Sequence, residues 1–185
     1  VDVIFLLGLV KLNKGEPENA LGLFDEARQK EPGQAEYHAA AGDALMAMER
    51  AEEAEKAYRE TIKLSAQTSE YMFRLGQALW AQGRRDKAEK TLIAGLSYDT
   101  DENQPEIRIA LSKLLIEKAE HLLRQGLIDD AIREGFRAAN LSPGHGEIKK
   151  ATDAIINFKR KNHKLLTLIY KSNEHTFIDY SAISP

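Results

Sequence analysis

Three glycines recur 34 residues apart in this chain, at Gly8, Gly42 and Gly76. Twelve residues after each glycine the sequence has an alanine, at Ala20, Ala54 and Ala88. A glycine inside a helix costs about 1 kcal/mol relative to alanine, so three in register need a reason that repeats with them. Close approach between helices is such a reason. The spacing therefore predicts a helical repeat protein whose units stack on copies of themselves.

Arranged in rows of 34 residues, the sequence aligns in columns over 1–34, 35–68 and 69–102. The column four residues after each alanine holds a large side chain, and the column three further on holds a small one. A fourth repeat covers 103–143, and its columns align only if the row starts at Ser112, nine residues later than the 34-residue spacing predicts. Its column residues are Ala119, Gly126, Ala131, Ala138 and Pro143. We expect the extra residues to lengthen the first helix of that row, over Pro105 to about Arg124.

These columns resemble the tetratricopeptide repeat family. The first row carries the pattern most completely, with Gly8, Gly15, Ala20, Phe24, Ala27 and Pro32. The resemblance implies an all-α fold, a right-handed superhelical solenoid of antiparallel helix pairs. Three positions depart from the pattern: Lys11 replaces a leucine, Glu49 replaces a turn glycine, and Gly135 stands where a large residue is expected.

The sequence after the four repeats changes character. Residues 144–161 keep a helical apolar stripe with many lysines, as expected of a capping helix with a polar outer face. Residues 162–185 are too apolar for a solvated tail, so we expect them to pack on the solenoid, on a second copy or on a missing domain. The chain lacks an initial methionine, and we expect it to be a fragment of a longer protein.

The chain shows no pattern typical of catalysis. It has no cysteine, no glycine-rich phosphate loop and no nucleophile elbow, and none of its five histidines forms a pair with metal-ligand spacing. We therefore expect no enzymatic activity, no cofactor and no metal. A net charge of -3 disfavours nucleic acid as a partner, and no apolar run is long enough for membrane insertion. The compartment is not specified, with the cytoplasm slightly favoured.

The family resemblance implies a concave groove lined mainly by the first helix of each pair. The residues expected to face it, or to match the family's binding positions, are Phe5, Leu9, Leu12, Asn13, Glu36, Asp43, Met46, Glu70, Phe73, Arg74, Gln77, Trp80, Glu120 and Arg124. This surface is apolar with an acidic edge. Family members that bind chaperones hold a C-terminal carboxylate with lysines, asparagines and an arginine. Of the residues at those positions here, only Arg74 agrees, so a carboxylate tail is a disfavoured ligand.

These features predict a scaffold that binds a partner protein without catalysis. Its ligand would be an amphipathic helix or an extended peptide with apolar anchors and some basic residues. Trp80, the only tryptophan, either anchors that ligand or fills the seam to the next repeat. Two alternatives remain: a self-assembling oligomer formed through 165–180 or an exposed solenoid end, and the substrate-docking module of a larger enzyme such as a transferase.

Overall fold

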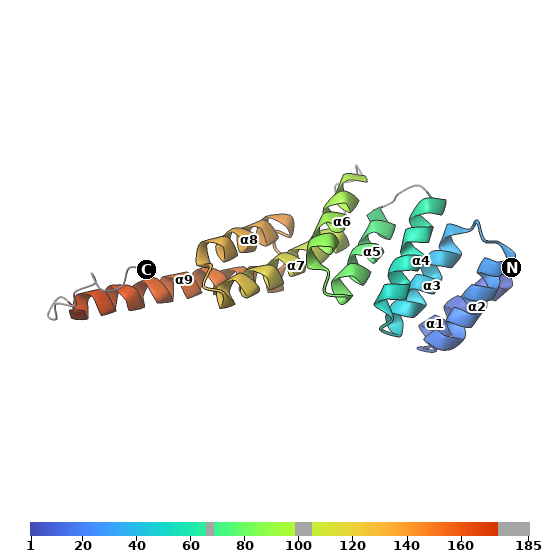
Figure 1. Cartoon of the computed structure of the whole chain (residues 1–185), viewed down its shortest axis with the longest axis horizontal. Helices are drawn as coiled ribbons and strands as arrows, with labels where there is room; N and C mark the ends of the chain where they lie inside the picture. The colour runs from blue at the N-terminus through green and yellow to red at the C-terminus, as the bar shows by residue number, and fades with distance from the viewer. Residues whose placement is uncertain (66–68, 99–104, 174–185) are drawn as a thin grey trace, which may run out of the picture. The chain divides into compact units, whose positions relative to one another are not determined.

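The computed structural model of the protein describes residues 1–65, 69–98 and 105–173. These residues form helices only, without any strand among them (Figure 1). In chain order the helices are α1 (Asp2–Asn13), α2 (Pro17–Lys30), α3 (Ala35–Ala47), α4 (Ala51–Leu64), α5 (Ser69–Ala81), α6 (Arg85–Tyr98), α7 (Pro105–Arg124), α8 (Ile128–Leu141) and α9 (Gly146–Asn173). The all-α helical repeat expected from the sequence is confirmed.

Short turns join the two helices of each pair, at the positions that the sequence predicts. Gly15, Gly83 and Gly126 adopt φ values of 74°, 73° and 79°, a left-handed conformation that glycine reaches without steric cost. In the second pair the equivalent residue is Glu49, with a φ of 59°. A side chain in this conformation is strained, so the turn between α3 and α4 keeps its geometry against an unfavourable residue.

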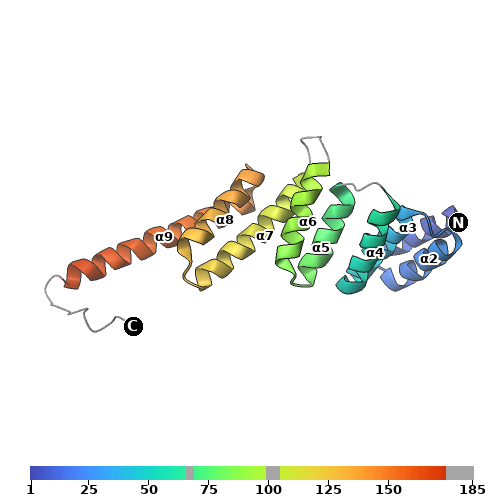
Figure 2. The same ribbon diagram turned by 45° about the horizontal axis from the view of Figure 1, so that its top comes forward.

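The recurrent glycines lie against large side chains of the second helix of each pair. Figure 2 shows two of these pairs, α3–α4 and α5–α6. A Cβ atom added at Gly8 would lie 2.5 Å from the Phe24 ring, and one at Gly76 would lie 2.6 Å from the Leu92 side chain. Gly42 faces the Tyr58 ring in the same way. Each glycine therefore makes room for a buried side chain of the second helix, which explains why the two columns recur together.

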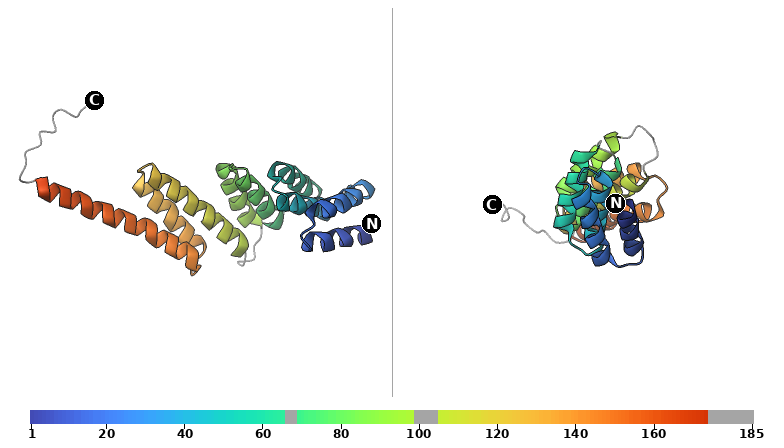
Figure 3. Two further views of the ribbon diagram at one scale, coloured as in Figure 1. Left: turned by 90° about the horizontal axis from the view of Figure 1, so that it is seen from below. Right: turned by 90° about the vertical axis from the view of Figure 1, so that its right-hand side faces the viewer.

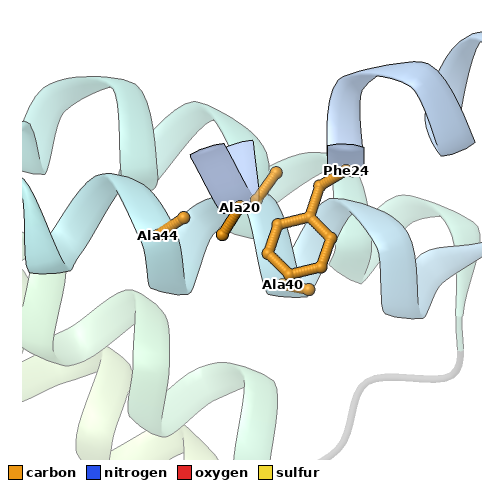
Figure 4. Close-up of a cluster of buried hydrophobic side chains, with 5 residues drawn as sticks. Ala20, Phe24, Ala40 and Ala44 are labelled. Carbon is orange, nitrogen blue, oxygen red and sulfur yellow. The ribbon is translucent and has the colours of Figure 1, made fainter. Parts of the chain in front are cut away.

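The hairpins pack on one another through a seam of small residues. Ala40, Ala41 and Ala44 of α3 are buried in one cluster with Ala20 and Phe24 of α2 (Figure 4). Because alanine side chains are short, the Phe24 ring can lie across the face of α3 and fill the space between the two helices. The Phe24 ring thus packs against Gly8 within its own hairpin and against α3 of the next hairpin.

A buried carboxylate also joins neighbouring hairpins. Glu55 of α4 accepts hydrogen bonds from Arg59 at 2.9 Å, from Gln82 at 2.9 Å and from Arg84. Gln82 and Arg84 belong to the turn between α5 and α6. Burial alone would raise the pKa of Glu55, but these hydrogen bonds and the arginine charges outweigh it and leave the pKa below its ordinary value. The glutamate therefore remains ionised as a fixed link between α4 and the next hairpin.

The chain divides into two compact units within α7, residues 1–114 and 115–185. In the second unit α8 and α9 lie side by side (Figure 3). The glycine at position 135, unexpected from the repeat pattern, faces α9, and a Cβ atom there would make an ordinary contact with Ile155 at 3.4 Å. Thr152 of α9 donates a hydrogen bond to the Gly135 carbonyl at 3.2 Å.

The capping helix was expected to end at residue 161, but α9 continues to Asn173. No glycine or proline interrupts 147–173, so nothing in the sequence stops the helix where its composition turns apolar. The side chains from 162 onward lie outside the described residues, as does the prediction of what they pack against. No helix among the described residues has both the length and the apolar composition required to cross a membrane.

Candidate functional site

Three of the predicted groove residues of α1 are partly buried against the core. Phe5, Leu9 and Leu12 all pack against the cluster that contains Phe24. The Phe5 ring has its centre 5.7 Å from that of Phe24 and 4.7 Å from that of Tyr37 on α3. Much of this surface is thus taken up by packing within the chain. The fourth predicted residue of α1, Asn13, is exposed.

On α3 the predicted residues have different environments. Glu36 is exposed and Met46 is half-buried. Asp43 accepts a hydrogen bond from the Tyr58 hydroxyl at 2.8 Å and forms an ion pair with Arg74 at 2.9 Å. Burial raises the pKa of the Asp43 carboxyl above its ordinary value, although Arg74 and the Tyr58 hydroxyl act in the opposite direction. Burial and the Asp43 charge together raise the pKa of Tyr58, which therefore remains a hydrogen-bond donor.

Arg74 is the one residue that matches the family's carboxylate-binding positions, and it is engaged within the chain. Besides Asp43, its guanidinium contacts Glu70 at 2.7 Å. Two carboxylates therefore surround one arginine, and an incoming ligand carboxylate would have to displace them and would meet their negative charge. That the groove does not hold a C-terminal carboxylate stays a prediction.

The remaining predicted residues of α5 line a pocket of about 550 Å³ within the first unit. Phe73, Gln77, Trp80 and Ala81 form the α5 side, and Glu106, Ile109, Ala110 and Lys113 form the α7 side. The walls are mainly apolar, with Gln77, Glu106 and Lys113 as the polar groups. A concave apolar pocket with a few polar groups is the usual form of a site that accepts one side chain or small group of a ligand.

The α7 side of this pocket comes from the lengthened part of the helix. Glu106, Ile109 and Ala110 precede Ser112, where the columns of the fourth repeat begin, and sequence reasoning did not include them among the site residues. The nine extra residues before that repeat were the signal that could have found them. An insertion of this length adds turns to the first helix, and these turns extend along α5 beside Trp80.

Acidic residues occupy the first turns of the first helices in this unit: Asp2, Glu36, Glu70 and Glu106. A negative charge is favourable at a helix N-terminus, which accounts for the residue type. Asp2 accepts a hydrogen bond from Tyr37 at 3.3 Å, and Glu70 pairs with Arg74. Of these residues Glu106 lines the pocket, where Lys113 supplies a basic side chain as well.

Glu120 and Arg124, the last two predicted residues, lie on the part of α7 that belongs to the second unit. Both are exposed. They are not among the residues that line the pocket of the first unit. Among the described residues, histidine and acidic side chains do not gather into a group that could hold a metal ion.

The repeat pattern and the fold can be compared with those of known proteins. The family model of the tetratricopeptide repeat matches the chain three times, over 5–67, 39–97 and 73–145. The chain belongs to the tetratricopeptide repeat family. Membership of this family and the fold together support a protein-interaction scaffold as its general role. Among curated proteins, none matches this sequence.

Solved tetratricopeptide repeat structures share the fold at low sequence identity. The YrrB structure, described as a TPR protein with an unusual peptide-binding site, has a TM-score of 0.63 and 18% identity, and the match covers 94% of this chain and 84% of YrrB. MamA 41-end from Desulfovibrio magneticus RS-1 has a TM-score of 0.67 and 17% identity, with 94% and 93% covered. The second TPR domain of human RPAP3, solved with the HSP70 peptide SGPTIEEVD, has a TM-score of 0.54 and 23% identity, with 58% and 88% covered.

Proposed function

We propose that this tetratricopeptide repeat protein binds a segment of a partner protein along the first helices of its N-terminal unit, without catalysis. The pocket between α5 and α7 supports this proposal most directly, because Phe73, Trp80 and Ile109 there form an apolar site open to a ligand. An aromatic or long aliphatic side chain of the partner would occupy it. The RPAP3 structure, solved with an HSP70 peptide, is an example of a peptide bound to this fold.

The charges on the first helices α3, α5 and α7 guide the choice of the rest of the ligand. Arg74 is already paired with Asp43 and Glu70, while Glu36 and Glu106 are exposed. The preferred ligand is therefore an amphipathic helix or extended peptide with an apolar anchor and one or two lysines or arginines near it. A peptide with an acidic C-terminal tail, such as the HSP90 peptide SRMEEVD of another family member, should bind poorly.

Selection from a displayed library of random peptides tests this proposal. Enriched sequences should combine apolar anchors with lysine or arginine. By calorimetry, Trp80→Ala should weaken their binding by about tenfold or more, because truncating an aromatic anchor at a good site costs about 2 kcal/mol. The melting temperature should change little. Phe136→Ala, an exposed aromatic on α8, is the matched control and should leave binding unchanged.

Two results would contradict the proposal. If Trp80→Ala left binding unchanged, the selected peptides would bind elsewhere. If it instead lowered the melting temperature strongly, Trp80 would belong to the packing between repeats and the pocket would not be a ligand site.

A further inference from the structure

The outer face of α1 carries a stripe of exposed apolar side chains, which we call the α1 stripe: Val3, Leu6, Leu7 and Val10. Their exposed fractions are 78%, 57%, 47% and 47%. Residues spaced by three and four lie on one face of a helix, so these four form a continuous surface. Contiguous exposed apolar surface of this kind typically marks an interaction site.

The repeat itself shows what covers this face. Residues 34 positions later in α3 are Tyr37, Ala40, Ala41 and Ala44, and all four are buried. Tyr37 is covered by α1, through the Phe5 ring and a hydrogen bond to Asp2. The three alanines are in one cluster with Ala20 and Phe24 of α2. A complete preceding hairpin, with both of its helices, therefore covers this register in the second repeat.

In the third repeat two of the four positions are buried in the same way, while the other two, Tyr71 and Arg74, are half-buried. Leu75 of α5 occupies the register of Leu7, and Ala78 occupies the register of Val10. Both are buried, and α4 packs against α5. A leucine in this register is therefore compatible with a hairpin packed on it. The size of the Leu7 side chain therefore does not prevent a hairpin from packing on α1.

We propose that the α1 stripe is the docking face for one more helical hairpin of this repeat type, stacked on α1 as α1–α2 stacks on α3. Its first helix would cover Val3 as Phe5 covers Tyr37. Its second helix would cover Leu6, Leu7 and Val10 with an alanine and a large side chain four residues apart, as at Ala20 and Phe24 or at Ala54 and Tyr58. This surface is separate from the α5–α7 pocket and does not depend on what the pocket binds.

A second copy of the chain fits this face less well. Among the described residues of the first unit, the second helices that could offer such a face are already covered, since α3 packs on α2 and α5 packs on α4. The Gly95 face of α6 likewise lies against Ile107 of α7. Two α1 stripes facing each other would bury only two turns of helix each, far less than the roughly 800 Å² per partner of a stable interface.

Thiol labelling tests the proposal cleanly because the chain has no cysteine of its own. Leu7→Cys in the full chain should react rapidly with a maleimide. The test protein carries a copy of residues 35–68 joined directly before Val1, which keeps the 34-residue spacing. This hairpin is chosen because it already packs on a helix with leucine in the same register. Labelling of the introduced thiol should then slow by at least about tenfold, because reaction would require the docked hairpin to open.

Three controls keep the result unambiguous. The same hairpin joined after Pro185 should leave the thiol of Leu7→Cys reactive, and Glu52→Cys, at an exposed site on α4, should label at the same rate with and without the added hairpin. Val3→Cys provides a second reporter if Leu7→Cys does not fold. Unchanged labelling in the fused protein would overturn the proposal. Protection of the Leu7→Cys thiol in the unfused chain, together with dimers in sedimentation that Leu6→Glu dissociates, would also overturn it and assign the stripe to a second copy.

Discussion

The first and third repeats place equivalent residues in different surroundings. Phe5 and Leu12 of α1 correspond to Phe73 and Trp80 of α5. In the first repeat the apolar side chains pack against the core, with Tyr37 of α3 lying on Phe5. In the third repeat they line an open pocket, because the helix that follows is a lengthened α7. The position of a residue in the repeat thus sets the face it lies on, and the neighbouring hairpin determines whether that face is filled.

The largest expected difference between the two regions concerns stability. Phe5→Ala removes ring contacts with Phe24 and Tyr37 and should lower the free energy of unfolding by about 2 kcal/mol. Phe73→Ala removes a ring that lines open space and should cost less than about 1 kcal/mol. Urea unfolding of the full chain measures both. Equal losses of stability would show that Phe5 and Phe73 are packed alike, contrary to the difference described above.

A smaller difference in stability is expected when Gly8 or Gly76, the glycines that contact a buried side chain of the second helix, is replaced by alanine. Gly8→Ala would push a methyl group into the Phe24 ring, which is rigid and fully buried, and should destabilise by about 1–3 kcal/mol. Gly76→Ala would meet the Cδ2 and Cγ atoms of Leu92, which is also fully buried but is smaller than a phenyl ring, so its cost should be no higher. Thermal and urea unfolding compare the two variants.

Gly22→Ala is the control for these glycine variants. It makes the same change within α2, where a Cβ atom would meet nothing within 4 Å. It should stabilise the chain by up to about 1 kcal/mol, because alanine is the better helix former. If Gly8→Ala also stabilised the chain, Gly8 would not be in close contact with the Phe24 ring.

The smallest effect is expected at Asp43, whose ion pair with Arg74 links α3 to α5. Because its pKa is raised in the folded state, the folded protein binds a proton here more readily than the unfolded chain does. Its contribution to stability is therefore most favourable below the ordinary carboxyl pKa and declines as the pH rises through the raised value. Asp43→Asn should remove this decline. The test is the difference between wild type and variant in urea unfolding across the acid range. A difference that does not vary with pH would contradict it.

The sequence predicted the features that recur with the repeat, namely the helix pairs and the turns that join them. The recurrent glycines predicted a close approach between the helices of a pair, and the turn glycines predicted where the pairs bend, but the contact of Gly8 with the Phe24 ring came from the structure. The sequence did not reveal that Phe5 packs under Tyr37 or that Arg74 pairs with Asp43, because these contacts join different hairpins and depend on side chains that vary between repeats. Ile109 was missed for another reason: it lies in the inserted residues, where the columns give no position.

The place of Trp80 in the pocket makes it a natural fluorescence reporter of that site. As the only tryptophan of the chain, it is the sole source of indole emission, and it lies in the α5 wall rather than in a buried core. A ligand side chain entering the pocket would change the polarity around this single indole. Intrinsic fluorescence of the unlabelled protein would therefore report occupancy of one site, without contributions from the other repeats.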